Sequence, residues 1–140
     1  MELSASTPEA APATCCGAPQ RPSASELCDR GLRRNRLEPF ELAGSTLHSE
    51  GLAAQFSLQC RGPAIASVRF KVSTCATLLA YCELLAELAV GCSVAEGGKF
   101  TAPLLVSELP GVPVYKRNRA ALAVAAFRSA LTRAGSPRST

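Results

Sequence analysis

The chain has 140 residues, of which 47% are hydrophobic and 19% charged, and 15 basic against 11 acidic residues give a formal net charge of +4. A chain of this length can bury one modest core, and so mild a charge without a continuous basic stripe argues against nucleic-acid binding. The apolar runs are too short, or too interrupted by glutamate, to cross a membrane. We therefore expect a globular protein with no nucleic-acid and no membrane partner.

The two ends of the chain differ in composition from its middle. Residues 1–22 are rich in Ala, Pro, Ser and Thr, and residues 135–140 read GSPRST. Because such segments bury little apolar surface, we expect disordered tails around a single domain at residues 23–134. The N-terminal stretch has no apolar segment typical of a secretory signal, and the seven cysteines form no CxxC pair, so we expect a cytoplasmic protein with reduced thiols.

The first half of the domain predicts a helix followed by antiparallel strands. Ser25 can cap a short helix that Pro39 closes. Apolar and polar residues then alternate along residues 53–60 and 64–72, with a turn at 61–63, which is typical of strands covered on one side only. A further strand near residues 45–48 would pair beside them. The residues expected to face the core are Phe56, Leu58, Cys60, Ala66, Val68, Phe70 and Val72.

A longer helix is predicted within residues 72–91. Ser73 or Thr74 can serve as its N-cap, and Gly91 is placed as the C′ residue. Glu83 and Glu87 lie one turn apart, and we expect them to form a solvated face. The apolar stripe, which makes Cys82 a core residue, consists of Leu78, Leu79, Cys82, Leu85, Ala86 and Ala89.

Three other cysteines of the domain have distinct settings. Cys75 lies at the start of this helix, where backbone N–H groups and the helix dipole favour a thiolate suited to metal or sulfur chemistry. Cys60 ends a strand and is expected to pack, whereas Cys92 follows Gly91 in a loop and is a weaker thiol candidate.

The last part of the domain predicts a linker and a long helix. Pro110 and Pro113 disfavour helix, so we expect an extended linker before a helix that runs from Tyr115 to Gly135. The order of helix, strands and further helices predicts an α+β fold, with a small antiparallel sheet of about three strands and helices packed on one face.

These elements resemble the U-type iron–sulfur cluster assembly scaffolds, the IscU and NifU N-terminal domain family. The block SVRFKVSTC, followed by a helix with Gly91 sixteen residues after Cys75, resembles the family's strand, turn and helix. ELPGVPVYKRNRAALAVAAFRSAL resembles its LPPVK stretch and the long helix after it, and LCDRGLRRNRLEPF resembles its first helix. The resemblance spans roughly residues 23–134 and implies a scaffold on which iron and sulfide form a cluster that is then passed on.

The resemblance also implies three cysteine ligands and an aspartate, of which this sequence retains only Cys75. His48 and Glu50 are candidate replacement ligands, and Lys116 could favour the Cys75 thiolate through its charge. A surface histidine and a solvated lysine are the plain alternatives for His48 and Lys116. The implied cargo is a transient Fe–S cluster, with zinc as the alternative ion. The other expected ligand positions are occupied by Ser49, Gly51 and Lys116.

Several functions stay open on the sequence alone. The first is a scaffold that assembles or helps to transfer Fe–S clusters with Cys75 as ligand. The second is an adaptor that binds a cysteine desulfurase or other assembly proteins without a cluster, and the third is a carrier of persulfide sulfur on Cys75. An unrelated α+β binding module is the remaining alternative. The single histidine offers no Ser/His/Asp arrangement, so we expect no enzyme. LPGVP at 109–113 leaves chaperone binding open.

Overall fold

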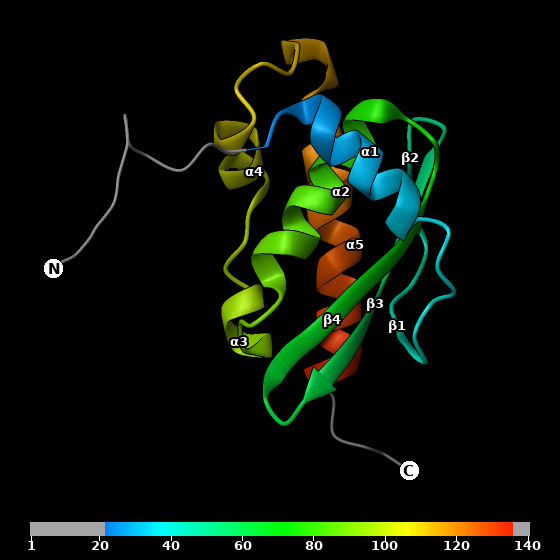
Figure 1. Ribbon diagram of the computed structural model, residues 1–140, viewed down its shortest axis with the longest axis vertical. Helices are drawn as coiled ribbons and strands as arrows, with labels where there is room; N and C mark the ends of the chain where they lie inside the picture. Colours follow the sequence, from blue (N-terminus) through cyan, green and yellow to red (C-terminus); the bar gives the residue numbers. More distant parts are fainter. Residues whose placement is uncertain (1–21, 136–140) are drawn as a thin grey trace, which may run out of the picture.

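The computed structural model describes residues 22–135, so the tails predicted at both ends lie almost entirely outside the described residues. One helix precedes the strands and the remaining helices follow them, which confirms the predicted α+β class (Figure 1). The elements in chain order are α1 (Ala24–Arg34), β1 (Leu42–Ala43), β2 (Leu47–Ser49), β3 (Leu52–Arg61), β4 (Ala64–Val72), α2 (Ala76–Ala89), α3 (Val94–Gly97), α4 (Ala102–Glu108), the 3-10 helix η1 (Val114–Lys116) and α5 (Asn118–Gly135).

Strand β3 is the centre of a four-stranded antiparallel sheet. It pairs with β4 along one edge and with the short strands β1 and β2 along the other. Gly62, with φ 60°, lies in the two-residue loop between β3 and β4. Glu50 and Gly51 form the loop between β2 and β3, and their φ angles of 52° and 80° are the positive values that a type I′ hairpin requires.

The hydrophobic alternation holds over most of the hairpin but fails at its far end. Phe56 and Phe70 lie opposite each other and both are buried, as predicted. The register shifts between Gln59 and Cys60, and beyond this point Ile65 is buried while Ala66 is exposed. A bulge puts one extra residue on one strand and so changes which side chains face inward. The expectation that Ala66 faces the core is therefore wrong.

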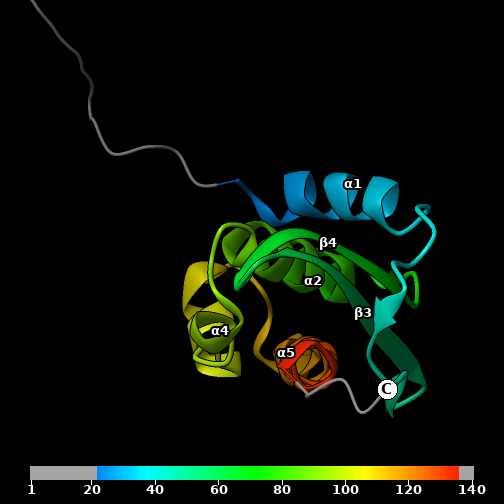
Figure 2. The ribbon, with the colours of Figure 1, turned by 90° about the horizontal axis from the view of Figure 1, so that it is seen from below.

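Helices α2 and α5 pack against one face of the sheet, α2 on β4 and α5 on β3 (Figure 2). The core between them contains an aromatic cluster in which the Phe56 ring lies 5.5 Å from both the Phe70 and the Phe127 ring, edge to face. Helix α1 packs on α2 through Gly31, which lies on the face of α1 that is turned toward α2. A Cβ atom on Gly31 would lie 2.9 Å from the Leu79 carbonyl oxygen, so this close approach needs glycine.

The alternation predicts that the outer face of the sheet is open to solvent. In the structure, part of this face is covered. The Ser57 side chain is buried, and its Oγ accepts a hydrogen bond of 2.9 Å from the Phe40 N–H. The Arg69 guanidinium lies 4.1 Å from the centroid of the Phe40 ring and donates to the Glu38 carbonyl at 2.8 Å. The segment between α1 and β1 therefore covers part of the polar face.

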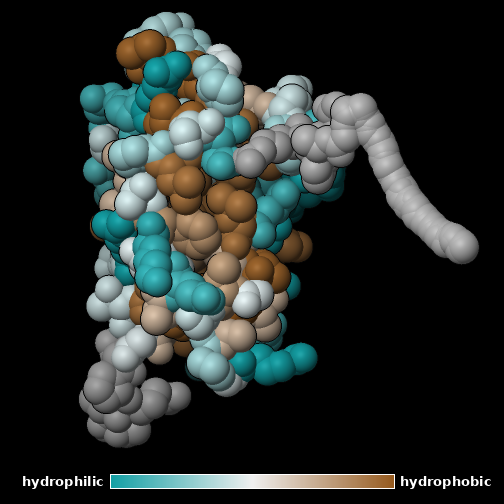
Figure 3. Space-filling model, turned by 90° about the vertical axis from the view of Figure 1, so that its left-hand side faces the viewer, coloured by the Kyte–Doolittle hydropathy of each residue, from teal (hydrophilic) through white to brown (hydrophobic). Residues whose placement is uncertain are grey.

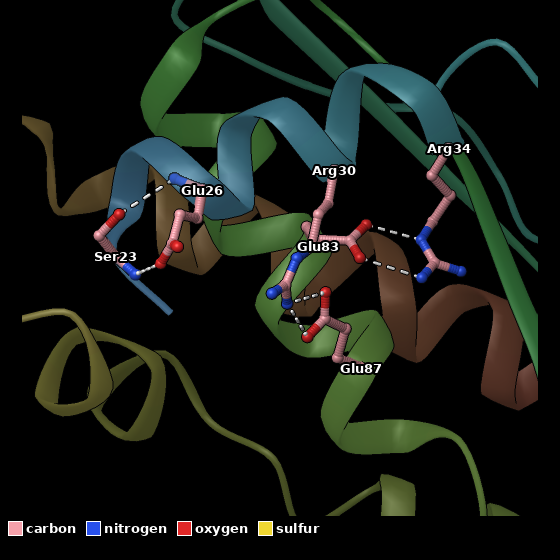
Figure 4. Close-up of polar contacts among 6 residues, drawn as sticks. All are labelled: Ser23, Glu26, Arg30, Arg34, Glu83 and Glu87. Carbon is pink, nitrogen blue, oxygen red and sulfur yellow. Dashed lines mark hydrogen bonds and ion pairs between the residues drawn. The ribbon is translucent and has the colours of Figure 1, made fainter. Parts of the chain in front are cut away.

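Helix α1 begins two residues earlier than the sequence suggested. Ser23, not Ser25, is its N-cap: the Ser23 Oγ accepts from the Glu26 N–H at 3.1 Å, and the Glu26 carboxylate accepts from the Ser23 N–H at 2.8 Å (Figure 4). This reciprocal capping box satisfies two of the free donors at the helix start.

Helix α2 begins after Cys75, which is its N-cap in place of the predicted Ser73 or Thr74. Ser73 serves the sheet instead, because its Oγ accepts a 2.8 Å hydrogen bond from the Ala53 N–H of β3. Gly91, with φ 93°, follows the C-cap residue Val90 as predicted. Cys82 is a core residue as expected, with no exposed surface.

The segment before α5 is more folded than predicted. Helices α3 and α4 were not expected, although Ser93 and Thr101 cap them with side-chain hydrogen bonds. Residues 109–113 form a turn rather than an extended linker, since the Val112 N–H donates to the Leu109 carbonyl at 3.2 Å and both side chains are buried.

No helix among residues 22–135 is both long and apolar enough to cross a membrane. The side of the molecule on which α4 lies carries a band of hydrophobic residues between polar ones (Figure 3).

Candidate functional site

The start of α2, the start of α5 and the β2–β3 hairpin meet at one end of the molecule (Figure 1). The Ser73 N–H donates to the Ala53 carbonyl at 2.9 Å, which fixes the segment before α2 beside β3. The Asn118 Nδ2 donates to Glu50 Oε1 at 2.7 Å, which joins the first residue of α5 to the hairpin loop. These contacts place residues from three distant parts of the sequence around Cys75.

Cys75 itself is half-buried and has the extended backbone of an N-cap residue, with φ −110° and ψ 123°. Its thiol makes no capping hydrogen bond of regular geometry. Burial alone would raise the pKa of the Cys75 thiol, but the Leu78 N–H, the Arg119 guanidinium and the Thr77 N–H together hold this pKa below its ordinary value. The thiolate is therefore easier to form at Cys75 than at an unperturbed cysteine, as is usual at the start of a helix.

Arg119, on the first turn of α5, supplies the positive charge next to this thiol. One terminal nitrogen of its guanidinium donates to Asn118 Oδ1 at 2.8 Å and reaches the Tyr115 carbonyl at 3.4 Å. The Arg119 Nε atom is buried and has no hydrogen-bond partner of regular geometry. Arg119 lowers the pKa of the Cys75 thiol through a side-chain hydrogen bond and through its charge.

The other cysteines in residues 22–135 have different surroundings. Burial raises the pKa of the Cys82 thiol well above its ordinary value, and burial together with the charge of Asp29 raises that of Cys28. The Cys92 thiol donates to the Leu88 carbonyl at 3.4 Å, and Cys60 is half-buried against the core. The pKa of the Cys75 thiol is lowered, in contrast to those of Cys28 and Cys82.

The sequence candidates around Cys75 are only partly brought together. Glu50 reaches the site indirectly, through Asn118. His48 is exposed on β2 and pairs with Ala53, and the Lys116 ammonium lies 5.9 Å from the centroid of the Tyr115 ring. Among residues 22–135, no group of three or more His, Cys, Asp or Glu side chains could hold a metal ion.

Of the candidate residues Cys75, His48, Glu50 and Lys116, Cys75 offers the one thiolate. A two-iron cluster needs four terminal ligands, usually thiolates. The thiolate at Cys75 is accompanied by a fixed cation at Arg119, which disfavours a second cation at the same sulfur. The arrangement suits a single nucleophilic thiolate, because an adjacent cation and backbone N–H groups activate a thiol without any metal.

Arg119 is the functional candidate that sequence reasoning missed. Lys116 was considered because it occupies an expected ligand position, whereas Arg119 lies one helical turn further on. The sequence signal was the basic cluster Lys116, Arg117 and Arg119, but only the orientation of α5 decides which of these faces Cys75.

Comparison with known proteins gives a distant likeness. No protein-family model and no curated protein matches the sequence. Among solved structures, the chain is similar to the N-terminal part of a nitrogen-fixing NifU-like protein from Brucella abortus, with 18% identity and a TM-score of 0.38 over 69% of this chain and 70% of that chain. The α+β class rests on the elements of this chain described above.

Proposed function

We propose that this chain is a scaffold-like protein of iron–sulfur cluster assembly that handles sulfur, rather than a complete cluster, on the Cys75 thiolate. The observation that carries the proposal is the Cys75 thiol at the start of α2 with Arg119 beside it, a setting that lowers its pKa. The resemblance of the block at residues 67–75 and the following helix to the U-type scaffolds supports the choice of pathway.

Of the functions left open by the sequence, sulfur carriage is the one that needs only what the site offers. A persulfide carrier requires one reactive thiolate. A cluster scaffold requires several ligands close together, and Ser49, Gly51 and Lys116 supply no thiolate at the expected positions. The adaptor function needs no chemistry at Cys75 at all, and so leaves the activated thiol unexplained.

The proposed step is a thiol–disulfide type exchange. The Cys75 thiolate attacks the terminal sulfur of a persulfide on the donor, for which we propose a cysteine desulfurase. A bond forms between Cys75 Sγ and that sulfur, the S–S bond of the donor breaks, and the donor cysteine leaves as a thiolate. One sulfur atom moves with no net oxidation or reduction, and Arg119 offsets negative charge at the reacting sulfur atoms.

The test is sulfur transfer followed by mass spectrometry. The full chain is incubated with a cysteine desulfurase and cysteine, and the tryptic peptide of residues 72–99, which contains Cys75, Cys82 and Cys92, is fragmented to locate added sulfur. We expect one added sulfur at Cys75 and none in the Cys75→Ser variant. Sulfur that accumulates equally in that variant, or no sulfur at Cys75, would contradict the proposal.

A further inference from the structure

Two arginines of α1 are bound to carboxylates of α2. Arg30 donates through Nη1 to both carboxylate oxygens of Glu87, at 3.0 and 3.1 Å, and Arg34 pairs with Glu83 (Figure 4). Each of these two carboxylates therefore already has a cation as its partner.

Arg33 lies on the same helix without such a partner. It is exposed, and among residues 22–135 its guanidinium makes no hydrogen bond and no ion pair, not even with Asp29 four residues earlier. Arg30 binds Glu87 through one terminal nitrogen only, so its other N–H groups keep their donors. Because residues three apart on a helix are neighbours on its surface, one anionic group can contact both guanidiniums.

An open hollow of about 510 Å³ lies at these arginines. Leu37, which follows α1, is 43% exposed there. Glu26, one turn before Arg30, is engaged in the capping box of α1 and does not line the hollow. The lining consists of Arg30, Arg33, Arg34, Leu37, Glu83 and Glu87. Its arginines outnumber its glutamates, so the hollow offers unbalanced positive charge beside an exposed leucine.

We propose that this hollow is a docking site for an acidic peptide segment of a partner protein, in which a large apolar side chain stands next to a carboxylate. The carboxylate binds the free N–H donors of Arg33 and Arg30, since guanidinium and carboxylate groups form paired hydrogen bonds. The apolar side chain covers Leu37 and so removes apolar surface from water. None of the lining residues is aromatic, so a nucleic-acid base has no ring to stack on and a peptide fits better.

The test measures the binding of labelled peptides to the full-length chain by fluorescence anisotropy. One peptide alternates glutamate and leucine, a second alternates glutamate and serine, and a third alternates lysine and leucine. We expect the glutamate–leucine peptide to bind about tenfold more tightly than the glutamate–serine peptide, which is the order of gain from burying one apolar side chain. The lysine–leucine peptide should show no binding.

Variants of exposed residues locate the site. Arg33→Glu should weaken binding of the glutamate–leucine peptide about tenfold, because it replaces the free cation with an anion. Leu37→Ser should make the glutamate–leucine and glutamate–serine peptides bind equally. Arg133→Glu is the matched control, since it makes the same change of charge at an exposed arginine in the last turn of α5 and should leave binding unchanged. All three variants should unfold in urea at the same midpoint as the wild type.

Several results would overturn the inference. They are no measurable binding of the glutamate–leucine peptide, equal affinity for the glutamate–serine peptide, binding of the lysine–leucine peptide, or an affinity that Arg33→Glu lowers no more than Arg133→Glu does. A single-stranded oligonucleotide that binds as tightly as the glutamate–leucine peptide would also overturn it, because charge alone would then account for the binding. None of these results depends on sulfur transfer to Cys75.

Discussion

Arg34 of α1 and Glu83 of α2 form a two-point ion pair, with 2.7 Å between Arg34 Nε and Glu83 Oε1 and 3.0 Å between Arg34 Nη2 and Glu83 Oε2 (Figure 4). Glu83 is only 2% exposed, so the expectation of a solvated glutamate is wrong. Burial raises the pKa of the Glu83 carboxyl, and the hydrogen bond from Arg34 opposes this rise. The same Arg34 side chain also donates to the Val68 carbonyl, so one residue joins α1, α2 and β4.

Arg34→Met should destabilise the protein strongly, because it leaves the Glu83 carboxylate buried without its cation. We expect a loss of about 3 kcal/mol in the free energy of unfolding, measured with urea. Arg30→Met is the matched control, since Arg30 pairs with Glu87 at 3.0 Å but its side chain is 43% exposed. A loss of at most about 1 kcal/mol is expected there. Equal losses in the two variants would contradict this description of the interface.

The rate of Cys75 alkylation by iodoacetamide should depend on pH in a direction that the site determines. The pKa of the folded thiol is lowered, so its rate profile should be centred at lower pH than that of the same cysteine in the urea-denatured chain. Ionisation of Cys75 should add stability that is present above the pKa of the unfolded thiol and lost as pH falls through the folded value.

Cys28 is the internal control for that measurement. Burial and Asp29 raise the pKa of its thiol, so its profile should move to higher pH on folding, opposite to Cys75. Profiles of Cys75 and Cys28 that shift in the same direction would show that the surroundings of Cys75 are not those described here.

Gly44→Ala should destabilise the packing of β1 on α5. A Cβ atom at Gly44 would lie 2.5 Å from the Ala130 nitrogen and 2.7 Å from the Ser129 carbonyl carbon, and backbone atoms cannot move aside as a flexible side chain can. We expect a loss of about 2 kcal/mol in the free energy of unfolding, as for other overpacked sites. Gly111→Ala is the control, because a Cβ there meets nothing within 4 Å. A Gly44→Ala variant as stable as Gly111→Ala would contradict this contact.

Local patterns were sufficient for the main elements of the fold and insufficient where distant segments meet. Alternation around Phe56 and Phe70 predicted the hairpin, and the spacing of Leu78 and Cys82 predicted α2 and its buried stripe. The bulge near Cys60 and the small helices α3 and α4 left weaker signals, since each depends on a few residues.

The site shows the same limit. The position of Cys75 before a helix was readable from the sequence, and so was the preference for a thiolate at such a position. The roles of Arg119 and Glu83 could not be predicted from the sequence. Arg119 acts on Cys75 and Glu83 pairs with Arg34. Each partner lies more than forty residues away, and no periodicity links such positions.

The most direct test of the central claim is to supply the full-length chain anaerobically with ferrous iron, a cysteine desulfurase and cysteine, and to measure iron together with sulfur at Cys75. We expect one added sulfur at Cys75, removed by Cys75→Ser, and no iron that stays with the protein after desalting. Stoichiometric iron and acid-labile sulfide that disappear in Cys75→Ser would contradict this expectation, and would show that Cys75 is a ligand in a cluster site.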